Sequence, residues 1–145
     1  LESYGDRTLH AYIGGGIWLD RPITGVGWEA SSEEWAYGPF LDAARARFPD
    51  EPDQAFPSPE HPWGIQLLYL QVAADLGIAG IVVLLGLAAA GIATGIRGIR
   101  SSPVALCGLG WLLVVPGVWT GIGLVSGLPL GALTWLSFGL VAVRD

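Results

Sequence analysis

The sequence predicts an all-α protein that crosses a membrane several times, and three observations support this fold class. Residues 76–96 contain no charged side chain, and a helix of that length, rising about 1.5 Å per residue, crosses the roughly 30 Å of a bilayer core. Two further apolar runs follow, at 103–125 and 128–143. Hydrophobic residues make up 52% of the chain, charged residues only 14%, and 22 of the 145 residues are glycine, a composition typical of membrane helices.

Charge divides the chain into two parts. Residues 1–63 contain 11 acidic residues and 4 arginines, whereas residues 64–145 contain 2 acidic residues and 3 arginines. The acidic first part argues against nucleic acid as a partner. Because the chain begins at Leu1 rather than Met, we expect it to be the C-terminal part of a longer multi-span protein. We expect a loop domain with short helices at 1–63 and three transmembrane helices in 64–145, at about 64–96, 103–125 and 128–143.

The arginines near the ends of the apolar runs predict the orientation in the membrane. Arg97, Arg100 and Arg144 flank the predicted spans on one side, and the positive-inside rule makes that side cytoplasmic. Residues 1–63 are therefore expected to be extracytoplasmic.

Two short helices are predicted in the loop domain. Apolar residues at i, i+3 and i+4 spacing indicate a helix over 6–19 that Pro22 follows. The serines at 31–32, ahead of two glutamates, predict the N-cap of a second helix at about 33–48, interrupted near Gly38 and Pro39. Five prolines within 49–62, together with acidic residues, predict a solvated loop rather than a packed element.

Two stretches of the sequence resemble the bacterial O-antigen ligase and polymerase family. Residues 21–28, RPITGVGW, resemble the family's PltGvG segment. Residues 68–80, LYLQVAADLGIAG, resemble the start of the helix that follows the family's large extracytoplasmic loop. A loop of similar character lies between them and apolar runs follow, so the resemblance covers most of the chain. The glycines of both stretches are assigned structural roles, in turns and close helix packing.

The resemblance implies a multi-pass glycan-transfer enzyme of the bacterial inner (cytoplasmic) membrane. Such enzymes move a saccharide from a polyprenyl-diphosphate carrier to an acceptor hydroxyl on the extracytoplasmic face, without a metal or nucleotide cofactor. Their loop arginines bind the diphosphate, and a histidine near the start of the central helix acts on the acceptor. Arg7 and Arg21 are the corresponding candidates in this chain, because a guanidinium presents a fixed fork of donors to phosphate oxygens.

The chain departs from the family motif at the histidine. The motif is His-Asn, nine residues, then Gly-x-x-Gly; Gly77 and Gly80 match, but counting back eleven residues from Gly77 reaches Gln66. His61 lies five residues earlier. An unperturbed histidine pKa of about 6.5 suits proton transfer near neutral pH. Either a short insertion has displaced the histidine, in which case His61 is the candidate general base, or the chain lacks the base.

Three residues at the start of the central helix are candidates for substrate binding. Gln66 and Tyr69 can orient an acceptor hydroxyl, although a glutamine cannot take its proton. Asp75 lies at the edge of the apolar run, and acids at membrane depth often mark functional sites. All three also have a structural alternative, as interfacial anchors or headgroup contacts.

Two other functions stay open. The first is a non-catalytic membrane module that binds or transports a lipid-linked glycan after losing the motif histidine. The second is a membrane anchor whose acidic loop recruits a partner. His61 stacked by Trp63, and arginines that snorkel at the interface or pair with a neighbouring acid, would fit these alternatives. The sequence contains one cysteine, Cys107, and no paired-cysteine metal motif, so neither a metal nor a cofactor is predicted.

Overall fold

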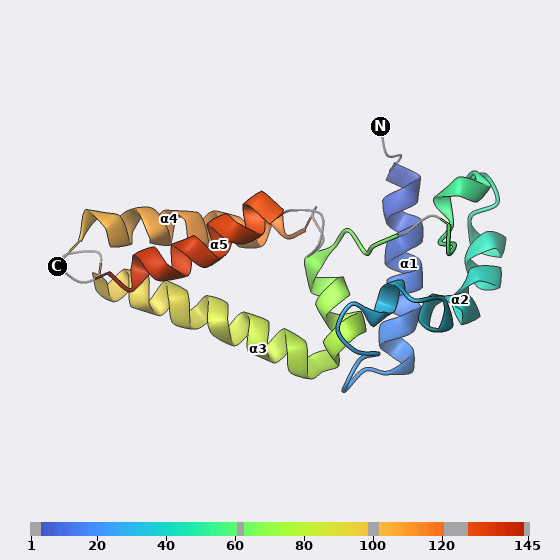
Figure 1. The fold of residues 1–145 in the computed structure, drawn as a ribbon, viewed down its shortest axis with the longest axis horizontal. Helices are drawn as coiled ribbons and strands as arrows, with labels where there is room; N and C mark the ends of the chain where they lie inside the picture. Colours follow the sequence, from blue (N-terminus) through green and yellow to red (C-terminus); the bar gives the residue numbers. More distant parts are fainter. Residues whose placement is uncertain (1–3, 61–62, 99–101, 121–127, 144–145) are drawn as a thin grey trace. The chain divides into compact units, whose positions relative to one another are not determined.

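A computed structural model describes residues 4–60, 63–98, 102–120 and 128–143 of the chain. These residues form α-helices and two short 3₁₀ turns without any strand (Figure 1), which confirms the predicted all-α class. The helices are α1 (Tyr4–Asp20), α2 (Glu34–Arg47), α3 (Leu68–Gly98), α4 (Pro103–Val118) and α5 (Leu128–Val141).

The chain folds as two compact units, residues 1–81 and 82–145, and α3 contributes to both. Residues 64–81 therefore pack with the N-terminal unit, although the predicted membrane helices begin at residue 64. The two packed units meet after Ile81, inside α3. The predicted boundary after residue 63 marks the change from polar to apolar sequence.

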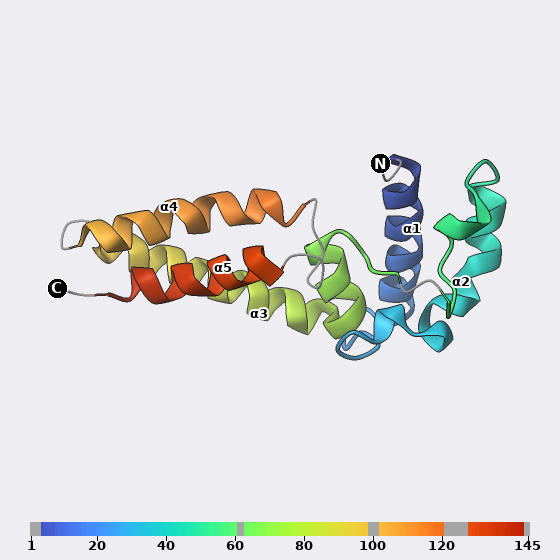
Figure 2. The ribbon, with the colours of Figure 1, turned by 45° about the horizontal axis from the view of Figure 1, so that its top comes forward.

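The N-terminal unit is built around one face of α1. Leu9, Ile13 and Ile17 are fully buried, as their spacing predicts. α2 lies beside α1 in both ribbon views (Figures 1 and 2) and contributes Tyr37 and Ala44 to the same core. Each buried leucine or isoleucine of this core stabilises the fold by about 1.5–3 kcal/mol relative to its exposed state.

The glycines in the middle of α1 make room for side chains from other elements. A Cβ at Gly14 would lie 2.7 Å from the side chain of Ile65, and one at Gly16 would lie 2.6 Å from the ring of Phe40. Bulky side chains thus pack against these glycines, and the helix keeps them for this packing despite their low helix propensity.

Three local predictions for the N-terminal unit are wrong. The serines at 31–32 belong to a 3₁₀ turn, and α2 begins after Glu33, which caps the helix without a side-chain hydrogen bond. α2 also continues through Pro39 without interruption, since its buried face packs against α1. In the proline-rich loop, Phe56 and Pro57 are buried. The ring of Phe56 belongs to the hydrophobic core of the N-terminal unit.

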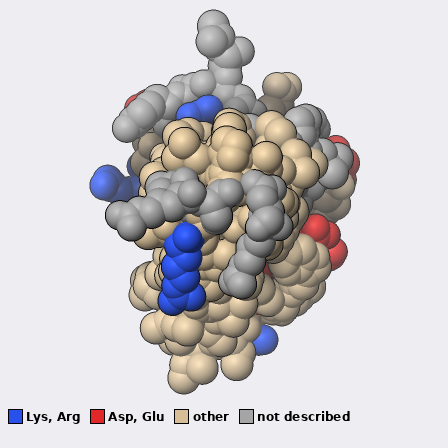
Figure 3. Space-filling model, turned by 90° about the vertical axis from the view of Figure 1, so that its left-hand side faces the viewer, with Lys and Arg blue, Asp and Glu red and all other residues tan. Residues whose placement is uncertain are grey.

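The C-terminal unit packs α4 and α5 against each other and against the second part of α3. Its buried cluster consists of Leu109, Leu112 and Val141, with Ile92 and Phe138 packed on it. On the face that Figure 3 shows, most of the coloured residues are neither acidic nor basic. The cluster is small, and many of the apolar side chains around it face outward.

Among the described residues, α3 is the one helix long and apolar enough to cross a membrane. It has 31 residues, and its most apolar window has a mean hydropathy of 2.5. The predicted spans at 103–125 and 128–143 correspond to α4 and α5, apolar helices of 16 and 14 residues. The length and apolarity of α3 are weakly consistent with membrane association, and three crossings stay a prediction.

Candidate functional site

The two stretches that carry the family resemblance contact each other through their backbones. The loop formed by residues 22–31 lies against residues 74–78 of α3, and we call this the loop–kink contact. Three hydrogen bonds join the two segments: Val26 N–H to Ala74 O at 3.0 Å, Gly27 N–H to Asp75 O at 2.8 Å, and Ile78 N–H to Pro22 O at 2.8 Å.

A break in α3 explains why these hydrogen bonds form. Gly77 has φ 65° and ψ −160°, a conformation that is essentially restricted to glycine. The break removes the helical bond between Ile78 N–H and Ala74 O, leaving a donor and an acceptor without their usual partners. Pro22 accepts the hydrogen bond of Ile78, and Val26 donates to Ala74. The loop therefore takes the place of the missing turn of helix.

Two glycines permit this approach of backbone to backbone. A Cβ on Gly25, whose φ is 64°, would overlap the carbonyl group of Asp75. A Cβ on Gly77 would overlap the carbonyl group of Ile23. Both positions thus need glycine for their dihedral angles and for the space, which agrees with the structural roles expected for these glycines.

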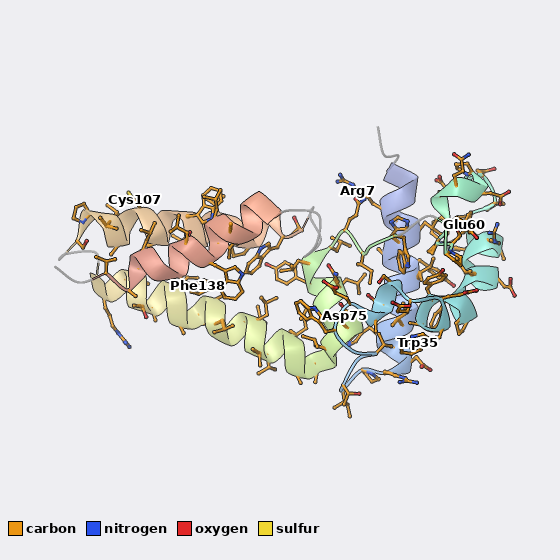
Figure 4. The ribbon with its side chains drawn as sticks, in the orientation of Figure 1. Arg7, Trp35, Glu60, Asp75, Cys107 and Phe138 are labelled. Carbon is orange, nitrogen blue, oxygen red and sulfur yellow. The ribbon has the colours of Figure 1, made fainter. Side chains whose placement is uncertain are left out.

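Asp75 lies at the centre of the loop–kink contact (Figure 4) and is only 3% exposed. Its Oδ1 accepts the backbone N–H of Ser31 at 3.0 Å, and its Oδ2 accepts that of Glu29 at 3.2 Å. Glu29 has a left-handed backbone with φ 57°, which is unusual for a residue other than glycine. Asp75 therefore holds the loop in a strained turn.

The protonation of Asp75 reflects its burial. Burial raises the pKa of its carboxyl above the usual value of 3.8, while hydrogen bonds from Ser31 and Glu29 act in the opposite direction without cancelling the rise. The exposed apolar part of α3 begins only at Ile78, so Asp75 lies before it. Both carboxylate oxygens bind backbone N–H groups of the loop, and the predicted contact of Asp75 with substrate stays a prediction.

Arg21 lies beside the loop–kink contact. Its carbonyl oxygen accepts the N–H of Gly25 at 3.0 Å. Its exposed guanidinium is 5.7 Å from the ring centroid of Trp35 and 3.8 Å from a carboxylate oxygen of Asp20. The pairing with Asp20 agrees with the structural alternative for this arginine, and the exposed guanidinium still offers donors to a phosphate.

Arg7 marks the opposite end of α1. Its side chain is exposed and projects from the helix in Figure 4. Fourteen residues separate it from Arg21, which corresponds to about 21 Å along a helix. Arg21 is linked to Asp75 by Gly25, which is hydrogen-bonded to Arg21 and lies against the backbone of Asp75. Arg7 lies at the other end of α1.

An aromatic contact connects the segment before α3 to the Arg7 end of α1. The rings of Trp63 and His10 meet edge to face with centroids 5.2 Å apart, and His10 lies one helical turn from Arg7. His10 Nε2 is 3.2 Å from the carbonyl oxygen of Ala55. His61 itself lies outside the described residues. The described geometry thus brings Trp63, two residues after His61 in sequence, to the Arg7 end.

Gln66 and Tyr69 are half-buried where the chain enters α3. Both residues already interact with other parts of the protein. Burial raises the pKa of the Tyr69 phenol, so the group stays protonated and can donate a hydrogen bond. Among the residues that the structure describes, no group of three or more His, Cys, Asp or Glu side chains is arranged to hold a metal ion.

The partners of Asp75 could not be predicted from the sequence. Ser31 and Glu29 bind it from 44 and 46 residues away, and no local pattern signals a contact over that separation. The glycines in residues 21–28 and 68–80 were the one available indication that these two backbones approach each other closely. No protein-family model, curated protein or solved structure matches the chain.

Proposed function

We propose that this protein transfers a saccharide from a polyprenyl-diphosphate carrier to an acceptor hydroxyl, as O-antigen ligases and polymerases do. The observation that carries the proposal is the loop–kink contact: the two stretches that resemble that family are far apart in sequence and are hydrogen-bonded to each other in the fold.

The reaction needs a base and a group that stabilises the leaving diphosphate at the same anomeric carbon. Reacting groups must lie within about 3–3.5 Å of each other in the reactive complex. We assign the base to His61 and the diphosphate contact to Arg7, since Trp63 packs at the Arg7 end of α1. Arg21, about 21 Å from Arg7 along the helix, is the alternative diphosphate contact.

In the proposed step, His61 accepts the proton of the acceptor hydroxyl and the hydroxyl oxygen attacks the anomeric carbon. The bond from that carbon to the diphosphate oxygen breaks, and the electron pair stays on the diphosphate beside Arg7. Gln66 and Tyr69 orient the acceptor by hydrogen bonding, and Asp75 fixes the loop. No metal or nucleotide takes part in the proposed step.

The proposed location is the bacterial inner membrane, with the N-terminal unit extracytoplasmic and several crossings. α3 supports one crossing through the apolar residues that follow its kink. Arg97, exposed at the far end of α3, is consistent with a cytoplasmic end. A polyprenyl carrier is itself a membrane lipid, so an enzyme that uses it needs a site close to the bilayer.

The test is glycan transfer in membranes that contain the full-length protein and a polyprenyl-diphosphate donor. We expect His61→Ala and Arg7→Gln to lower the rate about 100-fold or more, the scale of a lost general base. Arg47→Gln changes an exposed arginine of α2 and is the matched control, expected to retain full activity. An Arg21→Gln variant that loses transfer while Arg7→Gln retains it would move the diphosphate to the other end of α1.

Two outcomes would overturn the enzyme proposal. A fully active His61→Ala variant would remove the assigned base. A correctly inserted wild-type protein that binds the donor but transfers nothing would instead support the non-catalytic module that binds or transports a lipid-linked glycan.

A further inference from the structure

Five large apolar side chains are exposed on or beside the segments that form the loop–kink contact. We call them the apolar edge, and all belong to the N-terminal unit. Its members, with the exposed fraction of each, are Leu19 (73%), Ile23 (70%), Trp28 (60%), Trp35 (53%) and Ile78 (54%). Single exposed apolar residues are common, but a group of this kind around one structural feature marks an interaction surface.

The backbone joins the apolar edge to the start of the membrane-crossing segment. Pro22 O accepts the N–H of Ile78, and the carbonyl group of Ile23 lies against Gly77. Ile78 is itself exposed and belongs to the helix that is long and apolar enough to cross a membrane. Ile23 is therefore held beside the residue at which the exposed apolar part of that helix begins.

The residues beside the apolar edge are of the types that contact lipid headgroups. The guanidinium of Arg21 lies over the ring of Trp35, and about half of each side chain is exposed. Tryptophan is enriched at the membrane–water interface, where its ring is partly apolar and its N–H is hydrated. An arginine on its face can contact a lipid phosphate without losing the cation–π contact.

We propose that the apolar edge inserts into the outer part of the bilayer and holds the N-terminal unit against the membrane where α3 enters it. The occupant is lipid, because the loop that carries Ile23 is hydrogen-bonded to Ile78, a residue of the helix that is long and apolar enough to cross a membrane. Ile23 and Trp28 extend into the upper acyl region, and Trp35 with Arg21 lies among the headgroups. The inference does not require glycan transfer.

The depth of single residues in the bilayer tests this proposal. The substitution Cys107→Ala first removes the native cysteine. One cysteine is then introduced by Ile23→Cys or Trp28→Cys and labelled with a nitroxide. The full chain is reconstituted into vesicles of phosphatidylethanolamine and phosphatidylglycerol. Collision rates are then measured with oxygen, which concentrates in the bilayer, and with a water-soluble nickel chelate. Ala46→Cys, exposed on α2, is the control for a site in water.

We expect the labels at positions 23 and 28 to collide several-fold more often with oxygen than the control label does, and several-fold less often with the nickel chelate. Labels at 23 and 28 that match the control would overturn the proposal. Labels shielded from both reagents would also overturn it, because they would show protein, such as a second copy of the chain, covering the apolar edge. Neither measurement depends on enzymatic activity, so failure here is separate from failure of the glycan-transfer proposal.

Discussion

The backbone N–H of Ile78 donates a hydrogen bond to the carbonyl oxygen of Pro22 at 2.8 Å, although 56 residues separate them. A residue of the second helix segment thus finds in a loop the partner that a continuous helix would supply four residues earlier. The kink in α3 and the conformation of the loop depend on each other. Changes at either side are therefore expected to affect both.

Replacing Gly77 with alanine should destabilise the N-terminal unit strongly. The Gly77→Ala variant must place a Cβ where the carbonyl group of Ile23 lies, at a backbone conformation that costs about 1–3 kcal/mol for other residues. We expect a total loss above about 3 kcal/mol, because the steric overlap adds to that cost. Thermal unfolding in detergent measures the change.

The matched control is Gly86→Ala, which changes the same helix at a position where a new Cβ meets open space. Alanine favours a helix interior by about 0.5–1 kcal/mol over glycine, so the control should be neutral or slightly stabilising. If both variants unfold at the wild-type temperature, the break at Gly77 is not required for the fold.

The sequence predicted the helices better than the joint between them. Leu9, Ile13 and Ile17 repeat at helical spacing, and that local pattern survives folding because one partner surface covers the whole face. The break at Gly77 left no comparable signal, since apolar helix-forming residues surround it. Its conformation depends on a loop about 50 residues earlier in the chain.

The serines at 31–32 show the same competition between local and distant contacts. Their position ahead of acidic residues is typical of a helix N-cap, yet the N–H of Ser31 binds the side chain of Asp75. Two hydrogen bonds from backbone N–H groups to the buried carboxylate stabilise the fold more than one exposed helix cap would. The sequence predicted a substrate-binding role for Asp75, which stays a prediction, and the structure adds its contact with the loop.

Replacing Asp75 with asparagine tests this positioning role. The Asp75→Asn side chain keeps one oxygen but turns an NH₂ group toward the backbone N–H of Glu29 or Ser31, so one buried donor loses its acceptor. We expect a loss of about 1–3 kcal/mol and faster hydrogen exchange of the Ser31 amide. Asp42→Asn, at an exposed position of α2, should leave both quantities unchanged.

Hydrogen exchange separates a structural role for Asp75 from a catalytic one. If Asp75→Asn abolished glycan transfer while the Ser31 amide kept its protection and the unfolding temperature stayed the same, Asp75 would act on substrate directly. Activity that falls together with the protection of that amide supports positioning through the loop.

The raised pKa of Asp75 predicts a pH dependence. Because burial raises the pKa above its usual value of 3.8, the folded protein binds this proton more tightly than the unfolded chain does. The contribution of Asp75 to the unfolding free energy is therefore complete below pH 3.8 and falls as pH rises through the raised pKa. The penalty of Asp75→Asn should accordingly shrink over that interval. A penalty that grows as the pH rises would show that the folded protein prefers the ionised form.

A glycine of α3 provides the corresponding test for the C-terminal unit. A Cβ at Gly91 would lie 2.5 Å from the ring of Phe138 on α5 and 3.1 Å from the side chain of Leu112 on α4. Close packing of membrane helices depends on such small residues. The Gly91→Leu variant should therefore push α5 away from α3, at a cost of at least the 1–3 kcal/mol typical of an overpacked core.

Gly86→Leu adds the same side chain to the same helix, where the structure shows open space, and should unfold in detergent at nearly the wild-type temperature. Limited proteolysis should cut the Gly91→Leu protein between α4 and α5 faster than it cuts this control, because those helices lose their shared contact with α3. Equal cleavage rates and equal unfolding temperatures for the two variants would mean that the packing of α3 against α5 contributes little to the stability of the unit.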